Sequence, residues 1–237
     1  PSRQLPAGRA LPRIARGQRF NEVQAKEVAR ACGIPVPREL VAAGPAEAAR
    51  AAAQVGFPVA VKVVSADILH KTEVGGVRLG LGDGQAVHEA VETMAASVLQ
   101  KAPGAKVEGY VVSPMIAGGV ECVVGVVRDP VFGPVVMFGL GGVLIELMKD
   151  VAFRLAPVNE AQALEMIHET RGARLLEGFR GAPPADVPAL ARTIVAVSEL
   201  AAANADSLLT LELNPLRVLA AGQGVIALDA VIEAQPG

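Results

Sequence analysis

Three oxygen-bearing side chains near the C-terminal end of the sequence have the types and spacing of a magnesium site. Glu212 and Asn214 alternate in LELNPL, and Asp229 follows in ALDA. Side chains two positions apart on a strand share one face, and a hairpin would bring Asp229 beside them. Carboxylate and amide oxygens suit Mg²⁺, which also shares the phosphate oxygens of a nucleotide. A solvated strand face is the alternative, but the apolar neighbours of all three residues favour a metal, because an unpaired buried charge is costly.

Lys62 lies inside the apolar run VAVKVV, which is typical of an interior strand. A lysine buried in a sheet loses hydration unless an anion lies beside it, and a bound phosphate would supply that anion. An edge strand on which Lys62 faces water explains the run equally well.

Two short segments add candidate chemistry. His70 and Lys71 lie in the loop DILHKTEVGG, directly after this strand. A neutral histidine is an available nucleophile near pH 7, although most loop histidines and lysines are simply solvated. Gly141 and Gly142 end the segment FGLGG, where backbone N–H groups can approach a phosphate, although glycine also serves ordinary turns.

The elements that must position these residues follow from periodicity and from Gly and Pro stops. Helices are predicted at about 21–33, 45–55, 85–100, 160–170 and 188–203. Strands are predicted at 57–65, 75–81, 107–116, 120–129, 133–142 and 143–157, with a final two-stranded hairpin at 207–234. The strands from 107 onwards are too close together for crossover helices, so antiparallel pairing is expected.

This order of elements predicts an α+β chain with two lobes. We expect a linker or N-terminal arm at residues 1–19, a first lobe at 20–110 and a second lobe at 111–237. The arm is rich in Arg, Pro and Gly and shows no sustained period.

Composition excludes several classes of partner. The 237 residues are 51% hydrophobic, with a net charge of -2 and 3% aromatic residues, which argues against nucleic acid and an anionic membrane surface. No apolar run reaches the length of a membrane span, and the N-terminal residues lack the apolar region of a secretory signal. Two cysteines, Cys32 and Cys122, are too few for a disulfide framework, so we expect free thiols and a cytoplasmic protein.

Taken in order, five segments of the sequence resemble the ATP-grasp subunit or domain of ADP-forming acyl-CoA synthetases. They are GIPVP, FPVAVKVVSADILHKTEVGGVRLGL, RDPVFGPVVMFGLGG, KDVAFRLAP and ELNPL, and the resemblance covers about residues 20–235. It is strongest for the β subunit of ADP-forming acetyl-CoA synthetase, which is itself similar to the β subunit of succinyl-CoA synthetase. It implies a two-lobed ATP-grasp fold with the nucleotide in a cleft between the lobes.

The resemblance also implies roles for individual residues. Lys62 would contact the nucleotide phosphates, and His70 would relay the phosphoryl group. The backbone of Ser113, Met115 and Ile116 would lie at the adenine, and Glu121 near the ribose. Magnesium would be held by Glu212, Asn214 and Asp229. For Arg154, contact with a terminal phosphate and a salt bridge to Asp150 or Glu146 are both open.

The function implied is that of the component that binds ATP or ADP with Mg²⁺ in an ADP-forming acyl-CoA synthetase. Such a component is catalytically incomplete without a CoA-binding α subunit or covalently linked CoA-binding domains. Two alternatives remain: the C-terminal domain of a fused acyl-CoA ligase or acyltransferase, or a module that senses nucleotide without turnover. The sequence does not specify the acid, the choice of ATP or GTP, or the assembly.

Overall fold

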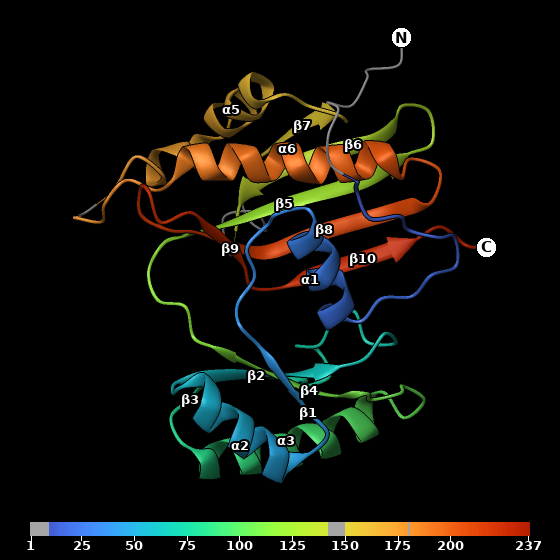
Figure 1. Ribbon diagram of the computed structural model, residues 1–237, viewed down its shortest axis with the longest axis vertical. Coiled ribbons are helices and arrows are strands. Elements are labelled where there is room, and N and C mark those ends of the chain that lie inside the picture. The colour runs from blue at the N-terminus through green and yellow to red at the C-terminus, as the bar shows by residue number, and fades with distance from the viewer. Residues whose placement is uncertain (1–9, 142–149, 180) are drawn as a thin grey trace. The chain divides into compact units, whose positions relative to one another are not determined.

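The computed structural model describes residues 10–141, 150–179 and 181–237, which form two compact units (Figure 1). Unit 2 contains residues 21–23 and 37–117, and unit 1 contains the described part of 10–20, 24–36 and 118–237. The chain therefore leaves unit 2 after residue 117, somewhat beyond the predicted division at 110/111. Residues 24–36 group with the C-terminal half, which no local pattern indicated.

The five predicted helices are present within one or two residues of their expected ends. They are α1 (Glu22–Ala31), α2 (Pro45–Val55), α3 (Gly84–Lys101), α5 (Glu160–Glu169) and α6 (Val187–Ala203). A 3-10 helix, η1 (Arg171–Leu175), follows α5. Across the described residues, none of the helices has the length and apolar content that a bilayer span requires.

Unit 2 is a four-stranded antiparallel sheet with two helices packed on one face. The strand order is β1-β4-β2-β3. Its strands are β1 (Leu40–Ala42), β2 (Val59–Val64), β3 (Val77–Leu81) and β4 (Gly109–Pro114). Val59, Val61 and Val63 of β2 form one apolar core with buried residues of α2 and α3. Because side chains alternate along a strand, Lys62 points to the sheet face opposite these helices.

The position of β2 decides between the two explanations of Lys62. The strand lies between β4 and β3, and each of its six residues is buried. The edge-strand alternative is therefore wrong. The β-branched run forms an interior strand because both of its neighbours satisfy its backbone hydrogen bonds.

Unit 1 is built on a six-stranded antiparallel sheet. The order is β10-β8-β5-β6-β7, and β9 pairs with β8. The strands are β5 (Val120–Asp129), β6 (Gly133–Leu140), β7 (Val151–Leu155), β8 (Leu208–Val218), β9 (Val225–Ala227) and β10 (Ala230–Ala234). The predicted antiparallel run is confirmed for β5, β6 and β7.

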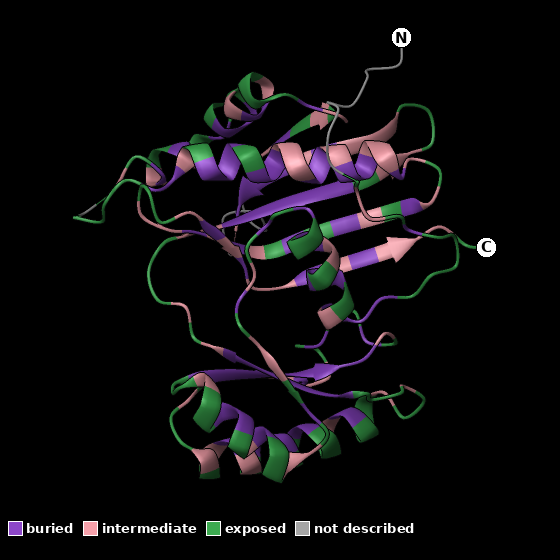
Figure 2. Cartoon of the chain, in the orientation of Figure 1, coloured by how far each residue is buried: buried purple, intermediate pink, exposed green. Residues whose placement is uncertain are grey.

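The two faces of the unit 1 sheet differ in character. Leu211 and Leu213 of β8 point into an apolar core that includes Leu190 and Ile194 of α6. We call this the helix face. Glu212 and Asn214 alternate with these leucines and are exposed on the other side, the opposite face. Figure 2 shows the resulting alternation of buried and exposed residues along β8.

The predicted C-terminal hairpin needs a correction. β8 is the expected first strand, but its partner is divided into β9 and β10. The division falls at Leu228 and Asp229, where the amide of Leu228 donates to the carbonyl of Pro215 at 2.9 Å. Asp229 therefore lies in an interruption between two short strands and not inside one.

The N-terminal segment that was expected to be an arm is packed against unit 1 from Leu11 onwards. Ile14 is buried, and its amide donates to Oδ1 of Asn204 at 2.9 Å. The guanidinium of Arg13 donates to the carbonyl of Ala203, and that of Arg16 to the carbonyl of Asp206. These basic side chains therefore bind carbonyls at and just beyond the C-terminal end of α6, where cations are favoured.

A buried carboxylate, Asp186, joins the start of α6 to the turn between β8 and β9. It accepts backbone hydrogen bonds from Ala189 at 3.0 Å, Gly222 at 3.0 Å and Gly224 at 2.9 Å. Burial raises the pKa of the carboxyl, but the three N–H donors, with Arg192 nearby, outweigh it and hold the pKa below its ordinary value.

We predict that Asp186→Asn lowers the free energy of unfolding at pH 7 by about 1–2 kcal/mol, because an amide group cannot accept all three bonds. A lowered pKa in the folded state means that the ionised carboxylate contributes stability above its unfolded pKa of 3.8 and loses it as the pH falls through the folded value. The difference between wild type and variant should therefore shrink below about pH 4 in urea unfolding curves.

Asp83→Asn is the matched control. Asp83 caps α3 through one bond from the amide of Ala86 at 2.8 Å, and asparagine retains that acceptor. Its cost should be a few tenths of a kcal/mol. Equal losses in the two variants would show that the additional donors to Asp186 contribute nothing.

Candidate functional site

The buried lysine predicted to need an anion has a carboxylate beside it. Nζ of Lys62 lies 2.8 Å from Oε1 of Glu22, in the first turn of α1. The second oxygen of Glu22 lies 3.1 Å from Nζ of Lys71. The side chains of Lys62, Glu22 and Lys71 are 10%, 0% and 6% exposed. We call these three residues the lysine pair cluster; its formal charge is positive, and Glu22 was not among the predicted site residues.

His70 lies directly before Lys71, on a turn that is fastened on both sides. It is exposed, whereas Ile68 is buried in the core of unit 2. The carbonyl of Lys71 accepts from the amide of Gly76 at 2.7 Å, and the carbonyl of Gly76 accepts from the amide of Val63 at 2.9 Å. A Cβ on Gly76 would lie 2.6 Å from Cγ1 of Val63, so this close approach needs glycine. The backbone of the turn that carries the exposed His70 is thus fixed beside β2.

The residues predicted at the adenine lie at the end of β4. Ser113 is buried and lies opposite Ala60 of β2 in the sheet. The amide of Met115 donates to the carbonyl of Pro58 at 3.1 Å, and Ile116 is half-buried. Pairing with β2 therefore fixes this backbone segment in unit 2, together with Lys62.

Glu121, the residue predicted near the ribose, belongs to unit 1 and is held by an arginine. One oxygen of its carboxylate lies 2.7 Å from Nη2 of Arg217, which lies opposite it on β8. Nη1 of Arg217 donates to the carbonyl of Gly118 at 3.0 Å. Sequence reasoning missed Arg217, because a cross-strand pair can be recognised only when the register of β5 and β8 is known.

Gly141 lies against the backbone of Glu121, to whose carbonyl its amide donates at 2.7 Å. A Cβ on Gly141 would lie 3.2 Å from three atoms of Glu121. Gly142, the other glycine of the predicted phosphate loop, lies outside the described residues. Cys122, the next residue of β5, is fully buried; burial, and then the Glu121 carboxylate, raise its pKa to about 12, so the thiol is not a nucleophile near neutral pH.

The structure brings two of the three predicted magnesium ligands, Glu212 and Asn214, into contact on the opposite face of unit 1. Nδ2 of Asn214 donates to Oε1 of Glu212 at 2.7 Å. Asp229 directly precedes β10, whose first residue, Ala230, pairs with Leu213 between the two ligands of β8. The local strand period and the antiparallel pairing of β8 with β10 together explain this arrangement.

These donors fit a magnesium ion that is shared with a nucleotide. Within the described parts of the chain, no group of three or more His, Cys, Asp or Glu residues is arranged to hold a metal ion. Glu212, Asn214 and Asp229 offer two carboxylates and one amide oxygen. Such a set would leave coordination positions of the ion for phosphate oxygens and water. That is the usual condition of Mg²⁺ at nucleotides and not that of a closed protein site.

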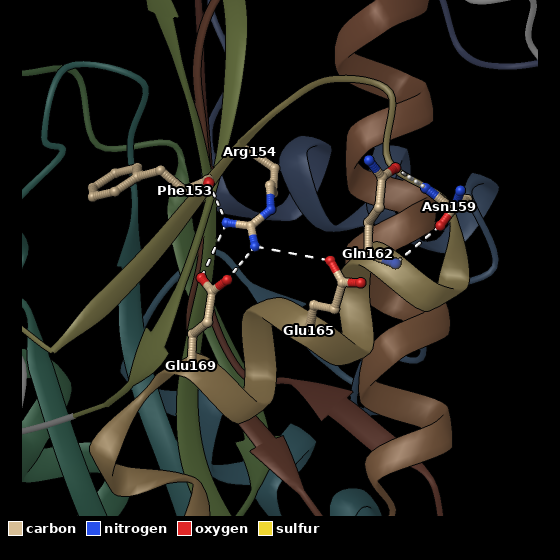
Figure 3. Close-up of polar contacts among 6 residues, drawn as sticks. All are labelled: Phe153, Arg154, Asn159, Gln162, Glu165 and Glu169. Atoms are coloured by element: carbon tan, nitrogen blue, oxygen red, sulfur yellow. Dashed lines mark hydrogen bonds and ion pairs between the residues drawn. The ribbon is translucent and has the colours of Figure 1, made fainter.

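Arg154 lies away from these ligands. It pairs with Val136 of β6 in the sheet, and Val136 is buried on the helix face, so Arg154 points to that face (Figure 3). Its guanidinium contacts the carboxylates of Glu169 and, at 4.0 Å, Glu165 on α5. The hydrogen bond between these two side chains raises the pKa of Arg154 and lowers the pKa of Glu169. Its predicted contact with phosphate is not supported by this position.

The salt bridge of Arg154 proposed with Asp150 is not formed, because Asp150 accepts the backbone amides of Arg171 and Gly172 instead. Glu146, the other proposed partner, lies outside the described residues. The predicted site residues thus fall into two groups. Unit 2 carries Lys62, His70, Ser113, Met115 and Ile116, and unit 1 carries Glu121, Gly141, Glu212, Asn214 and Asp229.

The chain has a two-unit α+β fold with the buried Lys62 on β2. Glu212 and Asn214 lie on β8, and Asp229 lies beside β10. These features are those of a class of nucleotide-binding proteins. A family described as "ATP-grasp domain" matches residues 13–234, so the chain belongs to the ATP-grasp family. The match begins upstream of the resemblance seen from the motifs alone and includes the buried Ile14.

Within this family the chain is similar to ADP-forming acetate–CoA ligases. It is 40% identical over 209 residues to acetate–CoA ligase [ADP-forming] I subunit beta of Pyrococcus furiosus, which covers 88% of this chain and 89% of that protein. It is 39% identical over 216 residues to acetate–CoA ligase [ADP-forming] I of Archaeoglobus fulgidus, covering 91% of this chain. The chain spans only 31% of the length of that second relative.

A solved structure has the same fold. It is the dinucleotide forming acetyl-coenzyme A synthetase 1 of Ca. Korarchaeum cryptofilum in complex with coenzyme A, Ca-AMPCP and HgCl⁺. The TM-score is 0.86 at 37% identity, over 92% of this chain and 95% of that chain. The predicted ATP-grasp fold is therefore confirmed.

Proposed function

We propose that this chain is the nucleotide-binding component of an ADP-forming acid–CoA ligase, which converts acyl-CoA, ADP and phosphate to carboxylic acid, CoA and ATP. The observation that carries the proposal is the lysine pair cluster directly beside His70 in unit 2. The ammonium group of Lys62 can receive phosphate oxygens, and a nucleophilic imidazole in the adjoining turn is suited to phosphoryl transfer.

The step assigned to this chain is transfer of a phosphoryl group between His70 and the nucleotide. In the direction of ATP formation, the nitrogen–phosphorus bond of the phosphohistidine breaks while phosphorus bonds a terminal oxygen of ADP. The electron pair of the broken bond stays on the ring nitrogen. Lys62 would neutralise charge on the oxygens of the transferring group, as cationic groups do in phosphoryl transfer.

We assign the magnesium to Glu212, Asn214 and Asp229, whose oxygen donors suit the ion. When bound, Mg²⁺ neutralises charge on the phosphates. The backbone from Ser113 to Ile116 would bind the adenine, and Glu121, oriented by Arg217, would accept hydrogen bonds from the ribose. Charge-assisted hydrogen bonds to a carboxylate are among the stronger polar contacts, which suits Glu121 to that role.

The chain is proposed to act with a CoA-binding α subunit or with linked CoA-binding domains. Both arrangements are represented among relatives, because one is a separate beta subunit and another is about three times longer than the matched region. We place the protein in the cytoplasm, in keeping with its two buried free thiols. A module that only senses nucleotide would have no use for the nucleophile, so we do not favour it.

The proposal is tested in the full-length protein together with its CoA-binding component. Acetyl-CoA, ADP, phosphate and Mg²⁺ should yield ATP, and calorimetry should detect ADP binding that requires Mg²⁺. After incubation with [γ-³²P]ATP and Mg²⁺, label should remain on the protein. Nucleotide binding without labelling or turnover would support the sensor, and absence of magnesium-dependent ADP binding would contradict the proposal altogether.

A further inference from the structure

Glu22 is the acid of the lysine pair cluster, and each of its oxygens forms an ion pair; within the described residues only Oε1 also accepts a hydrogen bond, from Lys62. Oε1 faces Lys62 at 2.8 Å and Oε2 faces Lys71 at 3.1 Å. The three side chains are at most 10% exposed, so their charges interact with little screening by solvent. One carboxylate therefore fixes two ammonium groups that come from different segments of unit 2.

The two lysines differ in what they hold in place. Lys62 belongs to the interior strand β2, whose backbone is fixed by β4 and β3. Lys71 belongs to the turn that carries His70, and it is fastened by its side chain to Glu22 and by its carbonyl to the amide of Gly76. Glu22 thus connects the phosphate-binding lysine to the turn that presents the imidazole.

His70 depends on this connection because it has a buried neighbour on only one side. Leu69 before it is 41% exposed, whereas Lys71 after it is 6% exposed. Consecutive Cα atoms lie about 3.8 Å apart, so a displacement of the Lys71 backbone also displaces His70. A misplacement of about 1 Å can cost about 100-fold in rate when reacting groups must be aligned.

We propose that Glu22 is a positioning residue for phosphoryl transfer: by binding Lys62 and Lys71 with one carboxylate, it holds the base of the His70 turn beside the lysine that receives the phosphate oxygens while the imidazole exchanges the phosphoryl group with the nucleotide. This inference rests on the proposed function. The transfer itself makes and breaks the bonds described above, and Glu22 takes no part in them.

The main test variant is Lys71→Met, in the full-length protein with its CoA-binding component, because it cuts the connection and leaves Lys62 paired with Glu22. We expect kcat for ATP formation to fall about 10- to 100-fold, with the KM for ADP and the calorimetric Kd of MgADP changed less than about threefold. Lys71→Arg, which keeps the charge, should recover most of the rate. Substituting a residue that only supports the fold would lower the fraction of folded protein. It would not lower kcat selectively while leaving KM unchanged.

Hydrogen exchange gives a readout that does not need activity. In Lys71→Met the amides of Glu73, Gly75 and Gly76, which donate to carbonyls within the turn, should exchange at least about tenfold faster, whereas those of β2 should be unchanged. Lys106→Met, at an exposed lysine of the same unit, is the matched control and should alter neither exchange nor rate. Unchanged exchange in Lys71→Met would overturn the inference even if the wild type proved inactive.

The double variant Glu22→Gln/Lys71→Met closes the argument. Both changes cut the same connection. The kcat of the double variant should therefore lie within about twofold of the kcat of Glu22→Gln alone. Losses that multiply, or a Lys71→Met enzyme with wild-type kcat, would contradict the positioning role. A wild type that forms no ATP would instead contradict the proposed function, so the two failures are distinguishable.

Discussion

His70→Ala is expected to lower ATP formation at least about 1000-fold and to abolish phosphoryl labelling of the protein, because it removes the only atom proposed to bond phosphorus. His70 is exposed, so the free energy of unfolding should change by less than about 0.5 kcal/mol. The measurement combines single-turnover ATP formation with mass spectrometry of the labelled peptide. Binding of MgADP should be retained, since the imidazole is not proposed to hold the nucleotide.

The other two histidines provide matched controls for this variant. His88 lies on α3, with its Nε2 3.5 Å from Glu92, and His168 lies in the last turn of α5. Alanine at either position should leave labelling and turnover within about twofold of wild type. Full labelling of His70→Ala would assign the phosphoryl group to another residue and would refute the role proposed for His70.

Lys62→Met is expected to weaken MgADP binding about 100-fold, because a charge-assisted contact to the phosphates is lost. The effect on stability should be smaller than burial alone suggests. The substitution leaves Glu22 paired with Lys71, one acid and one base, so we expect the free energy of unfolding to fall by less than about 1.5 kcal/mol. Calorimetry and urea unfolding measure the two quantities separately.

Glu22→Gln should show the reverse order of effects. It removes the carboxylate that two buried ammonium groups contact, and we expect a loss of about 3–5 kcal/mol in the free energy of unfolding, the usual consequence of breaking a buried ion pair. Its loss of ADP affinity should be smaller than that of Lys62→Met. If Lys62→Met were the less stable variant, the two lysines would not be sharing the charge of Glu22.

Glu47→Gln is the control for that substitution. Glu47 lies in the first turn of α2, is exposed, and accepts the amide of Ala43 at 2.8 Å, a bond that glutamine retains. The same change of side chain in the first turn of a helix should cost less than about 0.5 kcal/mol here. The contrast isolates the pairing with two lysines from any general effect of a glutamate in a first turn.

Part of the site was predictable because it depends on local pattern. The alternation that sets Glu212 and Asn214 on one face is a property of any strand, and their exposed positions on β8 agree with it. The β-branched run around Lys62 offered burial as one of two interpretations, and the need for a nearby anion in that case followed from the cost of burying a charge. The order of motifs was sufficient to indicate the ATP-grasp family.

The identity of that anion was not predictable. Glu22 precedes Lys62 by 40 positions, and the sequence offered a phosphate as the partner because no local pattern places the start of α1 beside β2. Arg217 and Glu121 are 96 positions apart and meet only through the register of β8 with β5. Arg154 was placed among the phosphate contacts, whereas the side of the sheet to which it points depends on the register of β7 with β6.

The sequence by itself determined most of the elements, the alternation of faces and the family, because each follows from residue types and short spacings. Only the tertiary structure decided that β2 is interior, that Asp229 lies in a break between β9 and β10, and that one carboxylate joins Lys62 to the turn of His70. These features depend on which distant segments the sheets bring together, and hydrophobic periodicity fixes the face of a strand but not its neighbour.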